Sequence, residues 1–138
     1  MENHIFTERP SKGSYNLTKA RLDLGRFGED LAVKTIKKLG YKLITRNFRC
    51  SLGEIDLIAN DHETLVFLEI KTRKGKSIHY AKEAVNTKKK RQLSKVALLY
   101  IKSKKLHDIK ARFDVVAISL DRGTTCIEVI KNAFDLTY

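Results

Sequence analysis

The sequence contains no tryptophan, a single proline and a single methionine among its 138 residues. Its two cysteines, Cys50 and Cys126, lie far apart without metal-site spacing, so neither a disulfide framework nor a zinc site is indicated. We expect them to be reduced thiols of a cytoplasmic protein. No apolar run approaches the roughly 18 residues of a membrane-spanning helix, and the first residues lack a signal-peptide core. We therefore expect no membrane association.

Acidic residues are also scarce. The 16 aspartates and glutamates are outnumbered by 28 lysines and arginines, which gives a formal net charge of +12. A protein this basic usually binds a polyanion, and nucleic acid, with DNA as the first candidate, is the expected partner. Charge alone also leaves open a ribosomal protein or a merely solvated basic surface.

The length and a hydrophobic content of 42% fit one domain with its own core. Residues 1–19 are polar and hold the only proline, Pro10, so we expect a flexible N-terminal tail followed by a single domain over residues 20–138. Hydrophobic periodicity predicts an α/β fold, with a mixed central β-sheet of about five strands flanked by helices. The expected helices cover residues 19–39 and 83–103, and the expected strands cover residues 41–50, 54–59, 64–72, 111–120 and 125–130.

The most informative stretch is residues 53–73, which has the pattern of two antiparallel strands joined by a polar turn. In the first strand, alternation predicts that Asp56 faces one side of the sheet and that Ile55 and Leu57 face the other. The second strand is apolar like a buried central strand, yet it contains Glu69 and Lys71, which are two residues apart and share a face. Buried charges are costly unless they are paired or metal-bound, so this cluster predicts a site for a hard divalent cation such as Mg²⁺.

Asp56, followed at a distance by Glu69-Ile70-Lys71, resembles the active-site hairpin of the PD-(D/E)XK nuclease superfamily. The wider segments Gly-Glu-Ile-Asp-Leu-Ile and Phe-Leu-Glu-Ile-Lys-Thr-Arg resemble the YraN-like family within it, which is related to Holliday-junction resolvases. The resemblance covers residues 20–134 and implies a restriction-endonuclease-like core in a single nuclease-like domain. Ile55 replaces the proline of the superfamily motif, a position that is commonly relaxed.

The resemblance implies a Mg²⁺- or Mn²⁺-dependent DNA endonuclease, acting on branched or repair-intermediate DNA. Asp56, Glu69 and the Ile70 backbone carbonyl would hold the metal, and Lys71 would orient the attacking water and offset phosphate charge. Glu29 lies beside the apolar stripe of the first helix. From the residues alone it is either a rim salt bridge or a functional carboxylate; the resemblance implies that it holds a metal-bound water or a second metal. One or two metals remain equally compatible with the sequence.

Basic residues flank this hairpin on both sides, and those of the second helix form one face with hardly any acid between them. We interpret them as a phosphate-binding surface, with a solvated surface as the alternative. The resemblance gives Lys88 a place facing the site. Asp114 is expected to pair with a basic neighbour or to cap backbone groups rather than to bind metal. The candidate nucleic-acid-binding residues are Arg46, Arg49, Arg73, Lys74, Lys76, Lys88, Lys89, Lys90, Arg91 and Lys95.

Two other functions remain open on the sequence. One is a nucleic-acid-binding protein that does not cut, and the other is an interaction module of a DNA-processing assembly whose charge binds an acidic protein. Resolvase-like action needs two symmetric cuts, for which a homodimer is expected.

Overall fold

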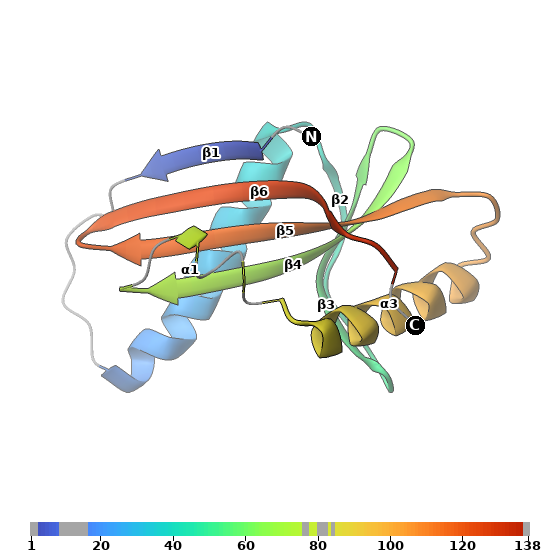
Figure 1. The fold of residues 1–138 in the computed structure, drawn as a ribbon, viewed down its shortest axis with the longest axis horizontal. Coiled ribbons are helices and arrows are strands. Elements are labelled where there is room, and N and C mark those ends of the chain that lie inside the picture. Colours follow the sequence, from blue (N-terminus) through green and yellow to red (C-terminus); the bar gives the residue numbers. More distant parts are fainter. Residues whose placement is uncertain (1–2, 9–16, 76–77, 80–82, 84, 137–138) are drawn as a thin grey trace.

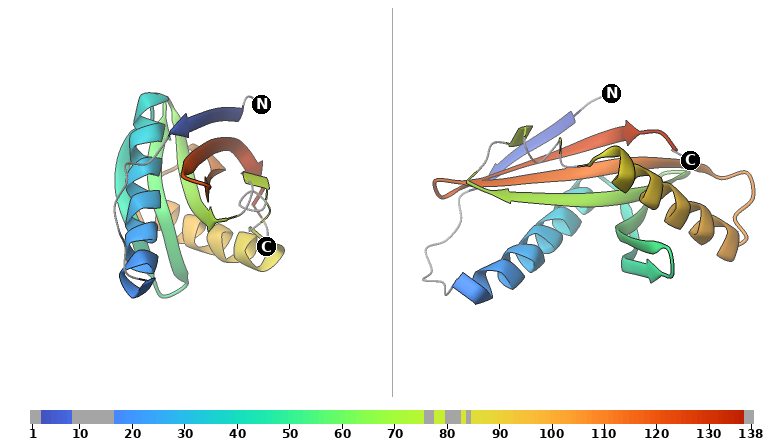
Figure 2. Two further views of the ribbon diagram at one scale, coloured as in Figure 1. Left: turned by 90° about the vertical axis from the view of Figure 1, so that its left-hand side faces the viewer. Right: turned by 60° about the horizontal axis from the view of Figure 1, so that its bottom comes forward.

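A six-stranded mixed sheet forms the centre of the protein, and helices α1 and α3 pack on its opposite faces (Figures 1 and 2). The computed structural model describes residues 3–8, 17–75, 78–79, 83 and 85–136. The principal elements in chain order are β1 (Asn3–Glu8), α1 (Leu17–Lys38), β2 (Lys42–Cys50), β3 (Gly53–Asp61), β4 (Thr64–Lys74), α3 (Thr87–Ser103), β5 (Lys110–Asp121) and β6 (Thr124–Phe134).

The strand order is β1-β6-β5-β4-β3-β2. Strands β4 and β5 are parallel and are joined through α3, whereas all other neighbouring pairs in this sheet are antiparallel. This confirms the predicted α/β class and the mixed sheet with a helical crossover. Across the described residues, no helix is long and apolar enough to cross a membrane.

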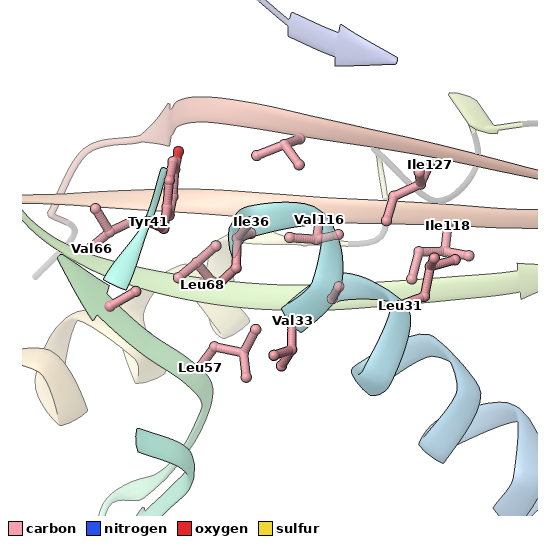
Figure 3. Close-up of a cluster of buried hydrophobic side chains, with 13 residues drawn as sticks. Leu31, Val33, Ile36, Tyr41, Leu57, Val66, Leu68, Val116, Ile118 and Ile127 are labelled. Atoms are coloured by element: carbon pink, nitrogen blue, oxygen red, sulfur yellow. The ribbon is translucent and has the colours of Figure 1, made fainter. Parts of the chain in front are cut away.

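Each face of the sheet has its own apolar core. On one face, Leu31 and Ile36 of α1 pack with Leu57, Leu68 and Val116 of the sheet (Figure 3). On the other face, α3 turns a stripe of buried side chains onto the sheet, and this stripe is the one expected from helical periodicity. The buried members of this second core include Leu93, Val96, Ala97 and Tyr100 of α3, with Ile55, Ile58, Phe67 and Phe113 of the sheet.

The sheet has one strand more than expected, because part of the predicted flexible tail is ordered. Residues Asn3–Glu8 form β1, which pairs antiparallel with β6, and α1 begins at Leu17 rather than at residue 19. The side chain of Asn3 also donates a hydrogen bond of 2.8 Å to Glu128 of β6. The expected tail over residues 1–19 is therefore corrected for these segments, since backbone pairing at the open edge of β6 does not require an apolar sequence.

A buried polar network ties the hairpin end of the sheet together and confirms the structural role expected of Asp114. Its fully buried carboxylate accepts hydrogen bonds from the Tyr41 hydroxyl at 2.7 Å, the Arg112 guanidinium at 3.0 Å and the Asn132 backbone N–H at 2.9 Å. Arg112 also contacts Asp61 at the end of β3, at 2.6 Å. Burial of these charges is tolerated because each is paired.

Helix α1 crosses β4 closely at Gly28. A Cβ added at Gly28 would lie 2.4 Å from Oγ1 of Thr72 and 3.6 Å from Cδ1 of Ile118. At Gly25, three residues earlier on the same helix, an added Cβ would meet no atom within 4 Å. The absence of a side chain at Gly28 thus sets the distance between α1 and the strand that carries Glu69 and Lys71.

We predict that Gly28→Ala lowers the free energy of unfolding by about 1–3 kcal/mol, because the new methyl group must displace Thr72 or the helix. Gly25→Ala is the matched control, and it should be neutral or stabilise by up to about 1 kcal/mol through helix propensity. Chemical denaturation of the two variants measures both effects. Equal stabilities for the two variants would contradict the close approach at Gly28.

Candidate active site

The site lies where β3 separates from β4. Ladder pairing between these strands runs from Asp61 and Thr64 to Leu57 and Leu68 and extends no further along β3. Beyond this point β3 turns away from β4 (Figure 1), and Oδ2 of Asp56 accepts a hydrogen bond of 2.8 Å from the backbone N–H of Ile70. The carboxylate thus takes the place that a backbone carbonyl of β3 would have in a continued ladder.

This separation also changes which way the side chains of β3 face. Leu57 belongs to the core under α1, whereas Ile55 belongs to the core under α3. The expectation that Ile55 and Leu57 share a face is therefore wrong. Strict alternation assumes a regular strand, and the strand bends at Asp56, opposite Asn47, whose φ is +53°.

Glu69 is the most buried charged group of the site, with only 5% of its surface exposed. Its Oε1 lies 3.3 Å from Nζ of Lys71 and 3.6 Å from Nζ of Lys89 on α3. The predicted shared face of Glu69 and Lys71 is confirmed. Two ammonium groups therefore converge on one buried carboxylate, which offsets its loss of hydration.

Burial raises the pKa of Asp56 to about 7, and the negative charge of Glu69 adds to this rise. The hydrogen bond from Ile70 and the charge of Lys89 act in the opposite direction. Without a further cation, Asp56 is therefore half-protonated near neutral pH. A raised carboxyl pKa in a partly buried site is typical of functional positions.

A stability measurement tests this pKa. In EDTA, the native protein should bind more protons than the unfolded chain between the ordinary aspartate pKa near 4 and about 7. The contribution of Asp56 to the free energy of unfolding should therefore fall as pH rises through this window, by up to about 1.4 kcal/mol per pH unit. The difference between the wild type and Asp56→Asn, measured by urea denaturation from pH 4 to 8, isolates this group. A difference that is constant with pH would contradict the raised pKa.

The structure gives Lys89 the place that the resemblance assigned to Lys88. Asn86 caps α3, and its side chain accepts a hydrogen bond of 2.9 Å from the backbone N–H of Lys89. This cap fixes the helix phase so that Lys89 points to Glu69, whereas Lys88 is exposed. The N-cap could have been predicted from the sequence, because asparagine before a run of helix-forming residues is a common signal for the start of a helix.

Replacing Lys89 with methionine should raise the pKa of Asp56 further, because a positive charge that favours the ionised carboxyl is lost. The matched variant Lys88→Met removes the same charge one residue earlier and should leave this pKa unchanged. A pH titration of the side-chain ¹³C carboxyl resonance of Asp56 measures both. Equal shifts in the two variants would show that Lys89 has no special place.

Glu29 lies beside the carboxylate pair and not within it. Its Oε1 accepts hydrogen bonds from Nε of Arg46 at 2.8 Å and from Nδ2 of Asn47 at 2.9 Å. Asn47 faces Asp56 across the β2–β3 ladder, since the flanking residues of the two strands are paired. Glu29 therefore forms the rim salt bridge that was one of its two expected roles. Its role at a second metal or a metal-bound water stays a prediction.

The predicted nucleic-acid-binding residues fall into two groups. Several are already engaged within the protein: Arg46 pairs with Glu29 and Asp30, Arg49 pairs with Glu54, Lys89 contacts Glu69, and Nζ of Lys90 lies 5.6 Å from the ring centroid of Phe134. Others are exposed on α3 or at the end of β4. These exposed residues are Lys88, Arg91, Lys95, Arg73 and Lys74, while Lys76 lies outside the described residues.

The donor set fits a hard divalent cation. Asp56 and Glu69 supply carboxylate oxygens, and the pKa of Asp56 is raised first by burial and then by the negative charge of Glu69. The carbonyl of Ile70 points toward the same gap as its N–H, because both groups of one strand residue face the same edge. In the described part of the chain no three His, Cys, Asp or Glu side chains gather as a metal cluster. Mg²⁺ commonly takes only one or two carboxylates and fills its other positions with water and phosphate.

Comparison with known proteins gives one family. Residues 28–118 match the model of the family described as Uncharacterised protein family UPF0102. The chain is similar to the UPF0102 protein of Geotalea daltonii, with 50% identity over 116 residues that cover 83% of this chain and 91% of that protein. The UPF0102 protein of Syntrophus aciditrophicus is 42% identical over 117 residues, covering 85% of this chain and 92% of that protein.

Proposed function

Because the chain belongs to protein family UPF0102, the YraN-like family indicated by its hairpin motif, we propose that it is a metal-dependent nuclease that hydrolyses phosphodiester bonds of DNA. The observation that carries the proposal is the convergence of Asp56, Glu69, Lys71 and Lys89 where β3 leaves β4. A structural ion pair alone would not need a second carboxylate that is half-protonated at neutral pH. A site that exchanges this proton for a cation does need such a carboxylate.

Asp56, Glu69 and the Ile70 carbonyl would hold a Mg²⁺ or Mn²⁺ ion. When bound, such a cation supplies Lewis acidity, polarising a phosphoryl oxygen and lowering the pKa of water. The hydrogen bond from Ile70 fixes one oxygen of Asp56, and Lys71 and Lys89 fix Oε1 of Glu69. These contacts pre-orient the carboxylates, so that little reorganisation is needed on binding.

In the proposed reaction a water oxygen forms a bond to phosphorus, the bond to one ester oxygen breaks, and a proton ends on the leaving oxygen. Lys71 is half-buried and its ammonium group carries hydrogen-bond donors, of which one is directed at Glu69. The others would orient the attacking water and offset the charge that develops on the phosphate. Lys89, whose Nζ contacts the same Oε1 of Glu69, would strengthen this positive field.

The exposed cations of α3 support nucleic acid as the substrate. Lys88, Arg91 and Lys95 project from the same helix that places Lys89 on Glu69. A phosphate backbone bound along this helix would therefore lie next to the carboxylates. Such contacts give affinity without base specificity and weaken as salt rises. A homodimer, which two symmetric cuts would need, stays a prediction.

Cleavage of end-labelled duplex, single-stranded and four-way-junction DNA tests the proposal. We expect cutting with Mg²⁺ or Mn²⁺ and none with EDTA. Glu69→Gln and Asp56→Asn should each lower the rate by at least about a hundredfold, because each removes a carboxylate that would hold the metal ion. Glu63→Gln is the matched control, since Glu63 is exposed in the β3–β4 turn, and it should cut like the wild type. Metal-independent cutting, or cutting that survives both site substitutions, would overturn the proposal.

A nucleic-acid-binding protein that does not cut is the second candidate. It is favoured by the exposed cations of α3 and by the lack, among the described residues, of a group of three or more metal-ligating side chains. It predicts DNA binding that is indifferent to divalent metal and unchanged in Asp56→Asn. The nuclease proposal predicts instead that Mn²⁺ binds to the wild type and not to this variant, which isothermal titration calorimetry measures.

A further inference from the structure

The turn between β2 and β3 carries an apolar residue at its apex. Only two residues, Ser51 and Leu52, join Cys50 to its ladder partner Gly53. Two-residue hairpin turns favour glycine, asparagine and aspartate, because these residues suit the backbone and are well hydrated. In this turn the positive φ, +140°, falls on Gly53, so Leu52 has an ordinary backbone conformation, and 46% of this apolar residue is exposed at the tip. A single exposed leucine is common on protein surfaces, so what matters is where this one lies.

The apex lies against Gln92 of α3. A Cβ added at Gly53 would lie 2.6 Å from Nε2 of Gln92, and φ at Gly53 is +140°, so glycine is required there. Nε2 of Gln92 also donates a hydrogen bond to the Leu52 carbonyl at 3.5 Å. Further along the hairpin, Phe48 and Cys50 pack on the core under α3. Leu52 is therefore carried on a fixed support and not on a loose loop.

Cations surround this support. On the surface of α3, Lys88 and Lys95 lie four residues before and three residues after Gln92, so they are its neighbours on the helix, and Arg91 is adjacent in sequence. All three are exposed. Figures 1 and 2 show the hairpin tip extending beyond the sheet beside the first turns of α3. A phosphate backbone held by these side chains would bring its bases to Leu52.

We propose that Leu52 is a wedge that enters the base stack of the bound nucleic acid and unstacks one base step, which makes DNA with a branch, bulge or mismatch the preferred ligand. The inference rests on the proposed binding of DNA by α3. Apolar side chains inserted from a charged surface are a known means of kinking a duplex, and the cost of unstacking is lowest where pairing is already broken. Leu52 and Asp56 are four residues apart, at most about 13 Å along a strand. The wedge therefore acts within about four nucleotide steps of the carboxylates.

The test uses the full chain in EDTA and DNA with 2-aminopurine at the branch of a three-way junction, where unstacking increases fluorescence. The wild type should raise the fluorescence at least about twofold on saturation and bind the junction about tenfold tighter than the matched duplex. Leu52→Ser should lose more than half of both effects but keep the dependence of affinity on salt, because phosphate contacts remain. Leu52→Phe should restore the fluorescence rise, since an aromatic ring also enters a stack.

Ile44→Ser is the matched control, because Ile44 lies on the same hairpin with nearly the same exposure, 44%. It should behave as the wild type. Full fluorescence with Leu52→Ser, an equal loss with Ile44→Ser, or no DNA binding by the wild type would each overturn the wedge. Unstacking by a protein that never cuts with Mg²⁺ or Mn²⁺ would leave the wedge standing and refute the nuclease. Metal-dependent cutting without unstacking would refute the wedge and leave the nuclease proposal standing.

Discussion

The hydrogen bond from the Ile70 N–H to Oδ2 of Asp56 is the contact on which the rest of the site depends. A buried N–H must have a partner, and beyond Leu57 the ladder between β3 and β4 no longer supplies one. The Asp56 side chain fills this role, so β3 can turn away without leaving β4 unsatisfied. The same turn opens the gap beside Glu69. Without this contact, the two strands would stay paired and their side chains would fill the space that a cation and a phosphate would need.

The charges around the gap are nearly balanced, and this balance has a chemical consequence. Two carboxylates, Asp56 and Glu69, are set against two ammonium groups, Lys71 and Lys89. Both close ion pairs use Glu69, and burial, with the charge of Glu69, raises the pKa of Asp56 to about 7. A metal ion bound as proposed would displace the Asp56 proton near neutral pH, because the ligand must lose its proton to bind. The lysines limit the net negative charge, which would favour the approach of an anionic phosphate in the proposed reaction.

Much of this arrangement could be predicted from the sequence, because it depends on local periodicity. The two-residue period of a strand places Glu69 and Lys71 together, and the turn chemistry of the hairpin brings Asp56 near them. The predictions that were wrong concern features that depend on tertiary contacts. Ile55 changes faces because β3 bends at Asp56. A shift of one residue along a helix turns a side chain by about 100°, so the capping of α3 by Asn86 decides between Lys88 and Lys89.

Glu29 and β1 illustrate a second limit. Helical spacing places Glu29 on the edge of the apolar stripe, but only the folded sheet brings Arg46 and Asn47 within hydrogen-bond distance of it. The strand β1 has no strong apolar pattern of its own. It exists because β6 offers an unpaired edge, and backbone pairing along an edge is largely independent of sequence. Neither the contacts of Glu29 nor the pairing of β1 with β6 has a local sequence signal, so local sequence patterns do not predict them.

The β2–β3 hairpin connects helix α1, strand β4 and the exposed tip. Asn47 on β2 contacts Glu29, Asp56 on β3 contacts Ile70, and Leu52 lies at the tip between them. The hairpin contacts α1 through Asn47 and α3 through the tip, and the tip is continuous with the strand that carries Asp56. Leu52, which would enter a base stack, and the Asp56 carboxylate would thus be positioned by the same hairpin. Recognition of distorted DNA and the placement of the reacting group would then be a single structural event and not two events linked by a flexible loop.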